Sequence, residues 1–322
     1  MNNPRVLALI TIVFWSFTAY LTRSISMRSQ VALLIVSMSC SFITMAIYFT
    51  LLRPRPASGR FTRVRLEYVL FGPLGYFVYA VALFQSYRAF NSASQTTVLN
   101  YTWPLFTVVF AEALFRQRAK RTVLQGAVEG LGITVGFLSV LVLGTEGRLA
   151  TLDFSNIPGV AWGLLAGASY GMFSAYSTTV SGEAQGTFLL TAVFLSVMLV
   201  ALTATATSEI GLLRTLTLRD VIYPAAWGCV GNGIGYITWT RANRLAREQE
   251  IGVSAVASAM FVLPLLALTM VALLLKETQL FHSYFALSVA LILLSSVLCQ
   301  KAGSIAGWLS RRWSFTPGSL EH

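Results

Sequence analysis

The chain has 322 residues, of which 56% are hydrophobic and only 11% are charged, and its mean hydropathy is +0.69. Soluble domains carry about 25% charged residues, so this composition excludes an ordinary soluble protein and indicates a polytopic membrane protein. The formal net charge is +11, but the basic residues flank apolar runs, where they face anionic lipid headgroups. We therefore expect membrane lipids as partners and no nucleic acid.

Apolar runs of the length needed to cross a bilayer, about 20 residues, recur along the whole chain. Ten such runs are predicted as transmembrane helices: 5–22, 31–51, 67–88, 93–115, 122–143, 157–180, 186–207, 219–241, 251–275 and 282–300. The connections between them are too short for a soluble domain. Residues 304–322 are expected to form a cytoplasmic tail that ends in a tag remnant, GSLEH. The predicted fold is an all-α integral membrane protein.

The basic residues predict the orientation of these helices. If the N-terminus is cytoplasmic, 16 of the 23 Lys and Arg residues fall in cytoplasmic segments and seven in external ones. Cytoplasmic loops are enriched in Lys and Arg. Both termini are therefore predicted to be cytoplasmic.

The fourth run contains an unusually polar stretch, VLNYTWPLF at residues 98–106. Asn100 and Trp103 are three residues apart and share a helix face, and Pro104 frees the backbone carbonyl of Asn100 from helical hydrogen bonding. A freed carbonyl and an amide can bind an ammonium or a hydroxyl group, and Tyr101 and Trp103 can form flat apolar walls. We predict that this face lines a substrate cavity. The alternative is a kinked packing helix in which Asn100 bonds to a neighbour.

Aromatic residues near the middle of other runs are candidates for the same cavity. Candidates in the first, third, sixth and eighth runs are Trp15, Tyr76, Tyr79, Trp162, Tyr236 and Trp239. The alternative for the tyrosines and Trp239 is an aromatic belt at the membrane surface, although belt residues usually lie near helix ends.

Glycines are regularly spaced in two runs. Gly159, Gly163, Gly167 and Gly171 form a four-residue stripe that favours close helix packing. The eighth run holds a cluster that favours a bend, Gly228, Gly231, Gly233 and Gly235. We predict hinges at Gly231 and Gly235 and at the two prolines Pro104 and Pro264.

Paired residues indicate an internal repeat. Gly75-Tyr76 recurs as Gly235-Tyr236 and Pro104-Leu105 as Pro264-Leu265, both 160 residues later, and Trp15-Ser16 matches Tyr170-Gly171 at an offset near 155. The chain is thus predicted to contain two five-helix repeats, residues 1–150 and 151–303. An odd number of spans per repeat makes the halves inverted around a central cavity. The alternative is coincidence among apolar helices.

Ten helices in two inverted halves, each with a proline in its fourth helix, resemble the drug/metabolite transporter superfamily with EamA-type repeats. In that pattern a Gly-Glu pair follows the proline; Lys276-Glu277 retains the glutamate, whereas Gln117 departs from it. Asn100-Tyr101-Thr102-Trp103-Pro104 resembles the Asn-Tyr-x-Trp-Pro segment of the bacterial aromatic amino acid exporter branch. The resemblance implies an inner-membrane amino-acid exporter whose cavity lies among helices 1, 3, 4, 6, 8 and 9, with helices 5 and 10 peripheral.

Groups for chemistry are scarce. The chain has two histidines and three widely spaced cysteines, so we predict no enzyme, no metal site and no cofactor. Apart from Glu67 and Asp220 at the starts of their runs, the carboxylates inside apolar runs are Glu112 and Glu129, and Glu129 is left open as a structural or proton-binding carboxylate. A neutral aromatic cavity suits a zwitterion with an apolar side chain. Alternatives are a transporter or flippase for another small metabolite or a lipid-linked substrate, and a non-transporting receptor. A monomer is compatible with the predicted transporter.

Overall fold

The computed structural model describes residues 3–23, 30–52, 61–90, 93–115, 122–152, 154–207, 209–251, 253–275 and 283–313, and these residues form helices and no strands. The α-helices are α1 (Pro4–Arg23), α2 (Gln30–Ile47), α3 (Leu66–Pro73), α4 (Tyr79–Phe90), α5 (Ala93–Asn100), α6 (Trp103–Ala113), α7 (Val123–Thr145), α8 (Ile157–Ser177), α9 (Gln185–Ala206), α10 (Leu218–Trp227), α11 (Tyr236–Glu248), α12 (Val253–Ala257), α13 (Leu263–Leu275), α14 (Ser283–Gln300) and α15 (Ala302–Trp313).

Four helical stretches are long and apolar enough to cross a membrane: Gln30–Leu52, Leu66–Phe90, Val123–Thr145 and Gln185–Ala206. A fifth is obtained if α14 and α15, which meet at a 74° bend, are counted as one span. Both numbers of candidate spans refer to the described residues and follow from helix length and composition. The structure thus indicates a helical membrane protein, while the prediction of ten spans stays a prediction.

Polar side chains begin several of these helices. The Thr122 side chain accepts a hydrogen bond from the Gln125 amide at the start of α7, and Asn156 does the same for Gly159 before α8. Thr217 and Asp220 form a reciprocal capping box at the start of α10. Each cap satisfies amides that a helix N-terminus leaves without intrahelical partners.

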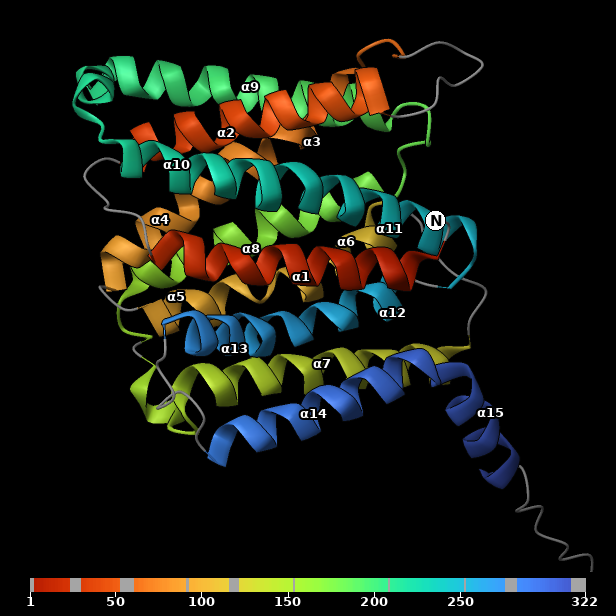
Figure 1. Ribbon diagram of the computed structural model, residues 1–322. Helices are drawn as coiled ribbons and strands as arrows, with labels where there is room; N and C mark the ends of the chain where they lie inside the picture. The colour runs from red at the N-terminus through yellow and green to blue at the C-terminus, as the bar shows by residue number, and fades with distance from the viewer. Residues whose placement is uncertain are drawn as a thin grey trace, which may run out of the picture.

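The helices lie roughly parallel in stacked layers (Figure 1). The central helix α1 packs against α11 and α13, while α8 packs against α4 and α6. α2 and α9 pack together at one edge of the bundle, and α7 and α14 pack together at the opposite edge (Figure 1). This arrangement surrounds α1 and α8 with neighbours and leaves α7 and α14 peripheral.

Four of the described helical stretches are interrupted by an irregular segment, and a fifth, Gln30–Leu52, ends in the π-helical segment Tyr48–Leu52. The π-helical segment Leu74–Val78 joins α3 to α4, and the π-helical segment Gly228–Gly235 joins α10 to α11. A turn at Tyr101 and Thr102 separates α5 from α6, and a 3₁₀ segment, Ser258–Val262, separates α12 from α13. α5 and α12 begin at residues 93 and 253, and α6 and α13 at residues 103 and 263. Both pairs are therefore 160 residues apart.

The glycine stripe of α8 is a packing surface. A Cβ atom added to Gly159 would lie 2.8 Å from the Phe90 ring, one added to Gly163 would lie 2.7 Å from Leu99, and one added to Gly171 would lie 2.5 Å from Phe106. Real Cβ atoms essentially never approach this closely, so glycine is what lets α8 contact α4, α5 and α6. The packing interpretation of the stripe is confirmed.

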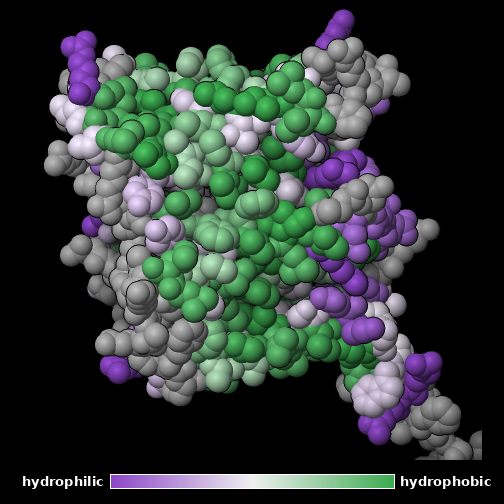
Figure 2. Space-filling model, viewed as in Figure 1, coloured by the Kyte–Doolittle hydropathy of each residue, from purple (hydrophilic) through white to green (hydrophobic). Residues whose placement is uncertain are grey.

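The surface of the molecule is dominated by hydrophobic residues, as Figure 2 shows for one face. Hydrophilic residues gather toward the end that holds the N-terminus, the end of α11 and the helix α15 (Figures 1 and 2). Exposed apolar side chains such as Leu51, Leu202 and Leu293 are 62–73% exposed, which is the expected state of residues that face lipid. Gln117, Lys276-Glu277 and residues 314–322 of the predicted tail lie outside the described residues.

Candidate functional site: a buried aromatic cluster

The structure brings most of the predicted site residues into one cluster of aromatic rings at the centre of the bundle. We call it the central aromatic cluster; its members are Trp15, Tyr76, Tyr79, Trp103, Tyr170, Phe173, Tyr236 and Trp239. They come from α1, the segment between α3 and α4, α4 itself, α6, α8 and α11. Helices far apart in the sequence therefore contribute to one site.

Trp15 lies in the middle of the cluster. Its ring centroid is 6.2 Å from that of Trp103, 5.9 Å from those of Tyr170 and Tyr236, and 6.0 Å from that of Trp239. Its indole Nε1 donates a 2.9 Å hydrogen bond to the Gly231 carbonyl. Most of these ring pairs are edge-to-face, the arrangement that the aromatic quadrupole favours.

Glycines make room for these rings. A Cβ at Gly235 would lie 2.3 Å from Trp15 Nε1, and a Cβ at Gly75 would lie 2.3 Å from the Phe173 ring. The two glycines precede Tyr236 and Tyr76. In each Gly-Tyr pair, the glycine therefore makes space for an aromatic ring from another helix, and the tyrosine adds its own ring to the cluster. Gly231 and Gly235 both belong to the π-helical segment before α11, and such segments are frequent at functional sites.

Tyr76 and Tyr236 make reciprocal contacts across the centre. Their ring centroids are 4.2 Å apart. The Tyr236 hydroxyl donates a 2.7 Å hydrogen bond to the Gly75 carbonyl, and the Tyr76 hydroxyl donates a 3.3 Å hydrogen bond to the Asn232 carbonyl. Each tyrosine thus bonds to the backbone beside the other.

The polar stretch of residues 98–106 lies on the wall of this cluster. Asn100 ends α5, and its Nδ2 donates a 3.4 Å hydrogen bond to the Tyr79 hydroxyl. Trp103 and Pro104 start α6 and are buried. The carbonyl oxygen freed by Pro104 lies beside α8, where a Cβ added to Gly167 would meet it at 3.3 Å. Its predicted role in ligand binding stays a prediction.

Two of the predicted aromatic residues lie outside the cluster. Trp162 on α8 is 37% exposed and makes no ring contact with the cluster. Tyr101 is buried at the turn between α5 and α6. Tyr170 and Phe173, conversely, are central but were not predicted as site residues; the match of Tyr170 with Trp15 in the repeat was the signal that could have identified the first.

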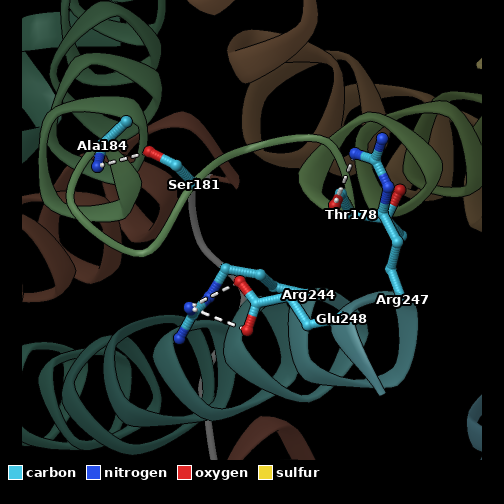
Figure 3. Close-up of polar contacts among 6 residues, drawn as sticks. All are labelled: Thr178, Ser181, Ala184, Arg244, Arg247 and Glu248. Atoms are coloured by element: carbon cyan, nitrogen blue, oxygen red, sulfur yellow. Dashed lines mark hydrogen bonds and ion pairs between the residues drawn. The ribbon is translucent and has the colours of Figure 1, made fainter. Parts of the chain in front are cut away.

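A row of hydrogen bonds joins α8 to α11 beside the cluster. Side chains four residues apart on α11 donate to the end of α8: Trp239 to Ser174 Oγ at 3.0 Å, Asn243 to Ser177 Oγ at 3.4 Å, and Arg247 to the Thr178 carbonyl at 3.3 Å. We call this row the α8–α11 ladder. Figure 3 shows its outer bond, next to the 3.0 Å ion pair between Arg244 and Glu248.

The α8–α11 ladder runs from the centre toward the end of the bundle that holds the N-terminus (Figure 1). Gln185, the first residue of α9, extends the contact with a 2.8 Å hydrogen bond to Thr240. The helices α8, α9 and α11 are therefore held together at this end.

The Glu129 side chain links α7 to α12, away from the cluster. One carboxylate oxygen accepts a 2.8 Å hydrogen bond from Ser254 of α12, and the other accepts a 3.1 Å hydrogen bond from Gln125. This geometry favours the structural interpretation of Glu129. Among the described residues there is no group of three His, Cys, Asp or Glu side chains that could hold a metal ion.

Comparison with known proteins identifies the architecture only. No protein-family model matches the chain, and no curated protein matches it significantly. A solved structure described as "Crystal structure of protein" is similar over 96% of this chain and 98% of that one, with a TM-score of 0.72 and 18% sequence identity. At this identity the likeness concerns the fold.

Proposed function

We propose that the chain is a secondary transporter of the bacterial inner membrane that exports amino acids, aromatic and other apolar ones foremost, by alternating access. The central aromatic cluster is its substrate site. The observation that carries the proposal is the convergence of Trp15, Trp103 and Trp239 from three helices around polar groups that bear no charge. Resemblance to the drug/metabolite transporter superfamily, with EamA-type repeats, points to the same activity.

An inverted repeat is the second part of the proposal. The reciprocal bonds of Tyr76 and Tyr236, and the equal spacing of the helix starts at 93 and 253 and at 103 and 263, support two related halves. So does the packing: α1 contacts α13 as α8 contacts α6, and α1 contacts α11 as α8 contacts α4. Halves of this kind open a shared site to either side by rocking.

The interrupted helices support the proposal that hinges take part in the transport cycle. Pro104 and Pro264 follow the two interruptions of the fourth and ninth helical stretches, and Gly231 and Gly235 lie in a π-helical segment. Discontinuous helices near the substrate site are common in transporters. We propose that these four residues absorb the change of helix direction when the site opens.

The α8–α11 ladder supports a conformation in which the proposed site is closed on one side of the membrane. The basic residues predict that the end holding the N-terminus is cytoplasmic, and the ladder joins α8 to α11 at that end. We therefore propose that the structure is closed on the cytoplasmic side, and that these bonds break when the site opens inward. The ten predicted spans and the cytoplasmic termini belong to this proposal.

Uptake of a panel of labelled amino acids into proteoliposomes tests the proposal. We expect saturable uptake of apolar amino acids by the wild type and at least tenfold slower uptake by Trp103→Ala, since one bulky wall contact in a pocket is worth about 1–3 kcal/mol. Trp308→Ala is the matched control, because Trp308 is 51% exposed on α15. Elution as a single species in detergent verifies folding. Uptake of no amino acid would overturn the proposal and bring lipid-linked substrates forward.

A further inference from the structure

Two buried polar atoms in the walls of the central aromatic cluster have no hydrogen-bond partner among the described residues. They are Oδ1 of Asn100 and the hydroxyl oxygen of Tyr170, which lies near the side-chain hydroxyls of Ser174 and Tyr236 without hydrogen-bond geometry to either. The indole N–H groups of the cluster are bonded: that of Trp15 to Gly231 and that of Trp239 to Ser174. Because native proteins leave few buried polar atoms without a partner, these two oxygens are available for a ligand.

The two side chains that carry these oxygens both contact Tyr79. Asn100 Nδ2 donates to the Tyr79 hydroxyl at 3.4 Å, and the Tyr79 ring lies 5.1 Å from the Tyr170 ring. The Trp103 ring is 5.0 Å from the Tyr170 ring on the other side. One wall of the cluster thus offers two oxygen acceptors together with several ring faces.

The charge of the wall favours a cation over an anion. The residues that form the cluster include no Lys, Arg or His, so a buried carboxylate would have no cationic partner there. An amide oxygen only accepts hydrogen bonds, a tyrosine hydroxyl can accept as well as donate, and ring faces are negative and attract ammonium groups. The amino end of a zwitterion therefore matches this wall, whereas its carboxylate end would find one neutral hydroxyl donor and no cation.

We propose that the site recognises its substrate by the ammonium group, bound by Asn100 Oδ1 and the Tyr170 hydroxyl among the aromatic rings, with no matching contact for the carboxylate. This inference rests on the proposed function and narrows it. The substrate class then extends from apolar amino acids to the corresponding primary amines, and it excludes the corresponding carboxylic acids.

Competition against labelled phenylalanine in proteoliposomes preloaded with unlabelled phenylalanine tests this inference. The competitors are 2-phenylethylamine, which lacks the carboxylate, and 3-phenylpropanoate and N-acetylphenylalanine, which lack the ammonium. We expect the amine to inhibit within about threefold of phenylalanine and both acids to be at least about tenfold weaker, the loss for a missing charge-assisted hydrogen bond. Protein-free vesicles correct for passive entry of the amine.

Variants of Asn100 and Tyr170 test whether these two residues cause the preference for the amine over the acid. Asn100→Leu and, more conservatively, Tyr170→Phe remove the two oxygens with little change in volume. We expect the preference for 2-phenylethylamine over 3-phenylpropanoate to fall below about threefold in the double variant. Tyr176→Phe is the control, since Tyr176 lies on the same helix and stacks on Phe71 outside the cluster; its preference should equal that of the wild type.

The outcomes separate this inference from the function on which it rests. If the wild type exchanges phenylalanine and 3-phenylpropanoate competes as well as the amine, the inference is wrong and the transport function stands. Such a result would indicate that Asn100 presents its N–H group to the ligand. If no amino acid is taken up, the proposed function fails and the inference fails with it. Should the double variant misfold, the wild-type panel and Tyr170→Phe decide the question.

Discussion

At Gly228 an added methyl group would collide with the backbone of another helix. An alanine Cβ there would lie 2.1 Å from the Ser37 carbonyl oxygen and 2.9 Å from the Ser37 Cα. Both are backbone atoms of α2, so no side chain can rotate away and the helices must separate by about 1 Å to reach ordinary contact in a close-packed interior. Overpacking of this kind costs about 1–3 kcal/mol, against a gain of up to about 1 kcal/mol from replacing a helical glycine.

Gly228→Ala should therefore lower the midpoint of thermal unfolding in detergent by about 2–8 °C, measured by the loss of the folded peak in size-exclusion chromatography after heating. Gly130→Ala is the matched control on α7, because its added Cβ would meet nothing within 4 Å. That variant should be as stable as the wild type or up to about 4 °C more stable. Equal midpoints for the two variants would refute the predicted contact between α2 and the segment before α11.

The remaining predictions concern interhelical hydrogen bonds. Ser174→Ala removes the acceptor of the Trp239 N–H and should cost about 0.6 kcal/mol. Trp239→Phe removes the donor but also leaves a cavity, so it should cost more than the bond alone; full additivity of the two changes in a double-mutant cycle would contradict the bond. Ser254→Ala removes a donor from the buried Glu129 carboxylate and should destabilise by about 1–3 kcal/mol in chemical unfolding, an effect that an unchanged midpoint would disprove. Arg247→Ala should speed hydrogen exchange in the last turn of α8 at least several-fold, while exchange in α7 stays at the wild-type rate.

The positions of helices could be predicted from the sequence because long apolar runs are visible in it. The third run, 67–88, corresponds to Leu66–Phe90, and the seventh, 186–207, corresponds to α9, Gln185–Ala206. What a run does not show is which face turns inward. In a membrane protein the lipid side is as apolar as the core, so hydrophobic periodicity carries little information about orientation.

Trp162 and Tyr170 illustrate this limit. Both are aromatic residues of α8, yet Trp162 is 37% exposed and Tyr170 only 3%. The sequence predicts Trp162 as a wall residue, whereas it indicates Tyr170 only as a match in the repeat. The contact of Tyr170 with Trp15 depends on the rotation of α8, which is set by the glycine stripe that packs against α4, α5 and α6 and not by the aromatic residues themselves.

The crossed hydroxyl bonds of Tyr76 and Tyr236 have a consequence for biosynthesis. While residues 1–150 leave the ribosome, the Asn232 carbonyl that accepts from Tyr76 has not yet been made, so the first half inserts with a phenol lacking its final carbonyl acceptor. When the second half is complete, it supplies the Asn232 carbonyl to Tyr76. Its own Tyr236 hydroxyl then finds an acceptor in the Gly75 carbonyl of the first half. The two halves should consequently mature together, and halves produced as separate polypeptides in one cell should escape proteolysis only when both are present.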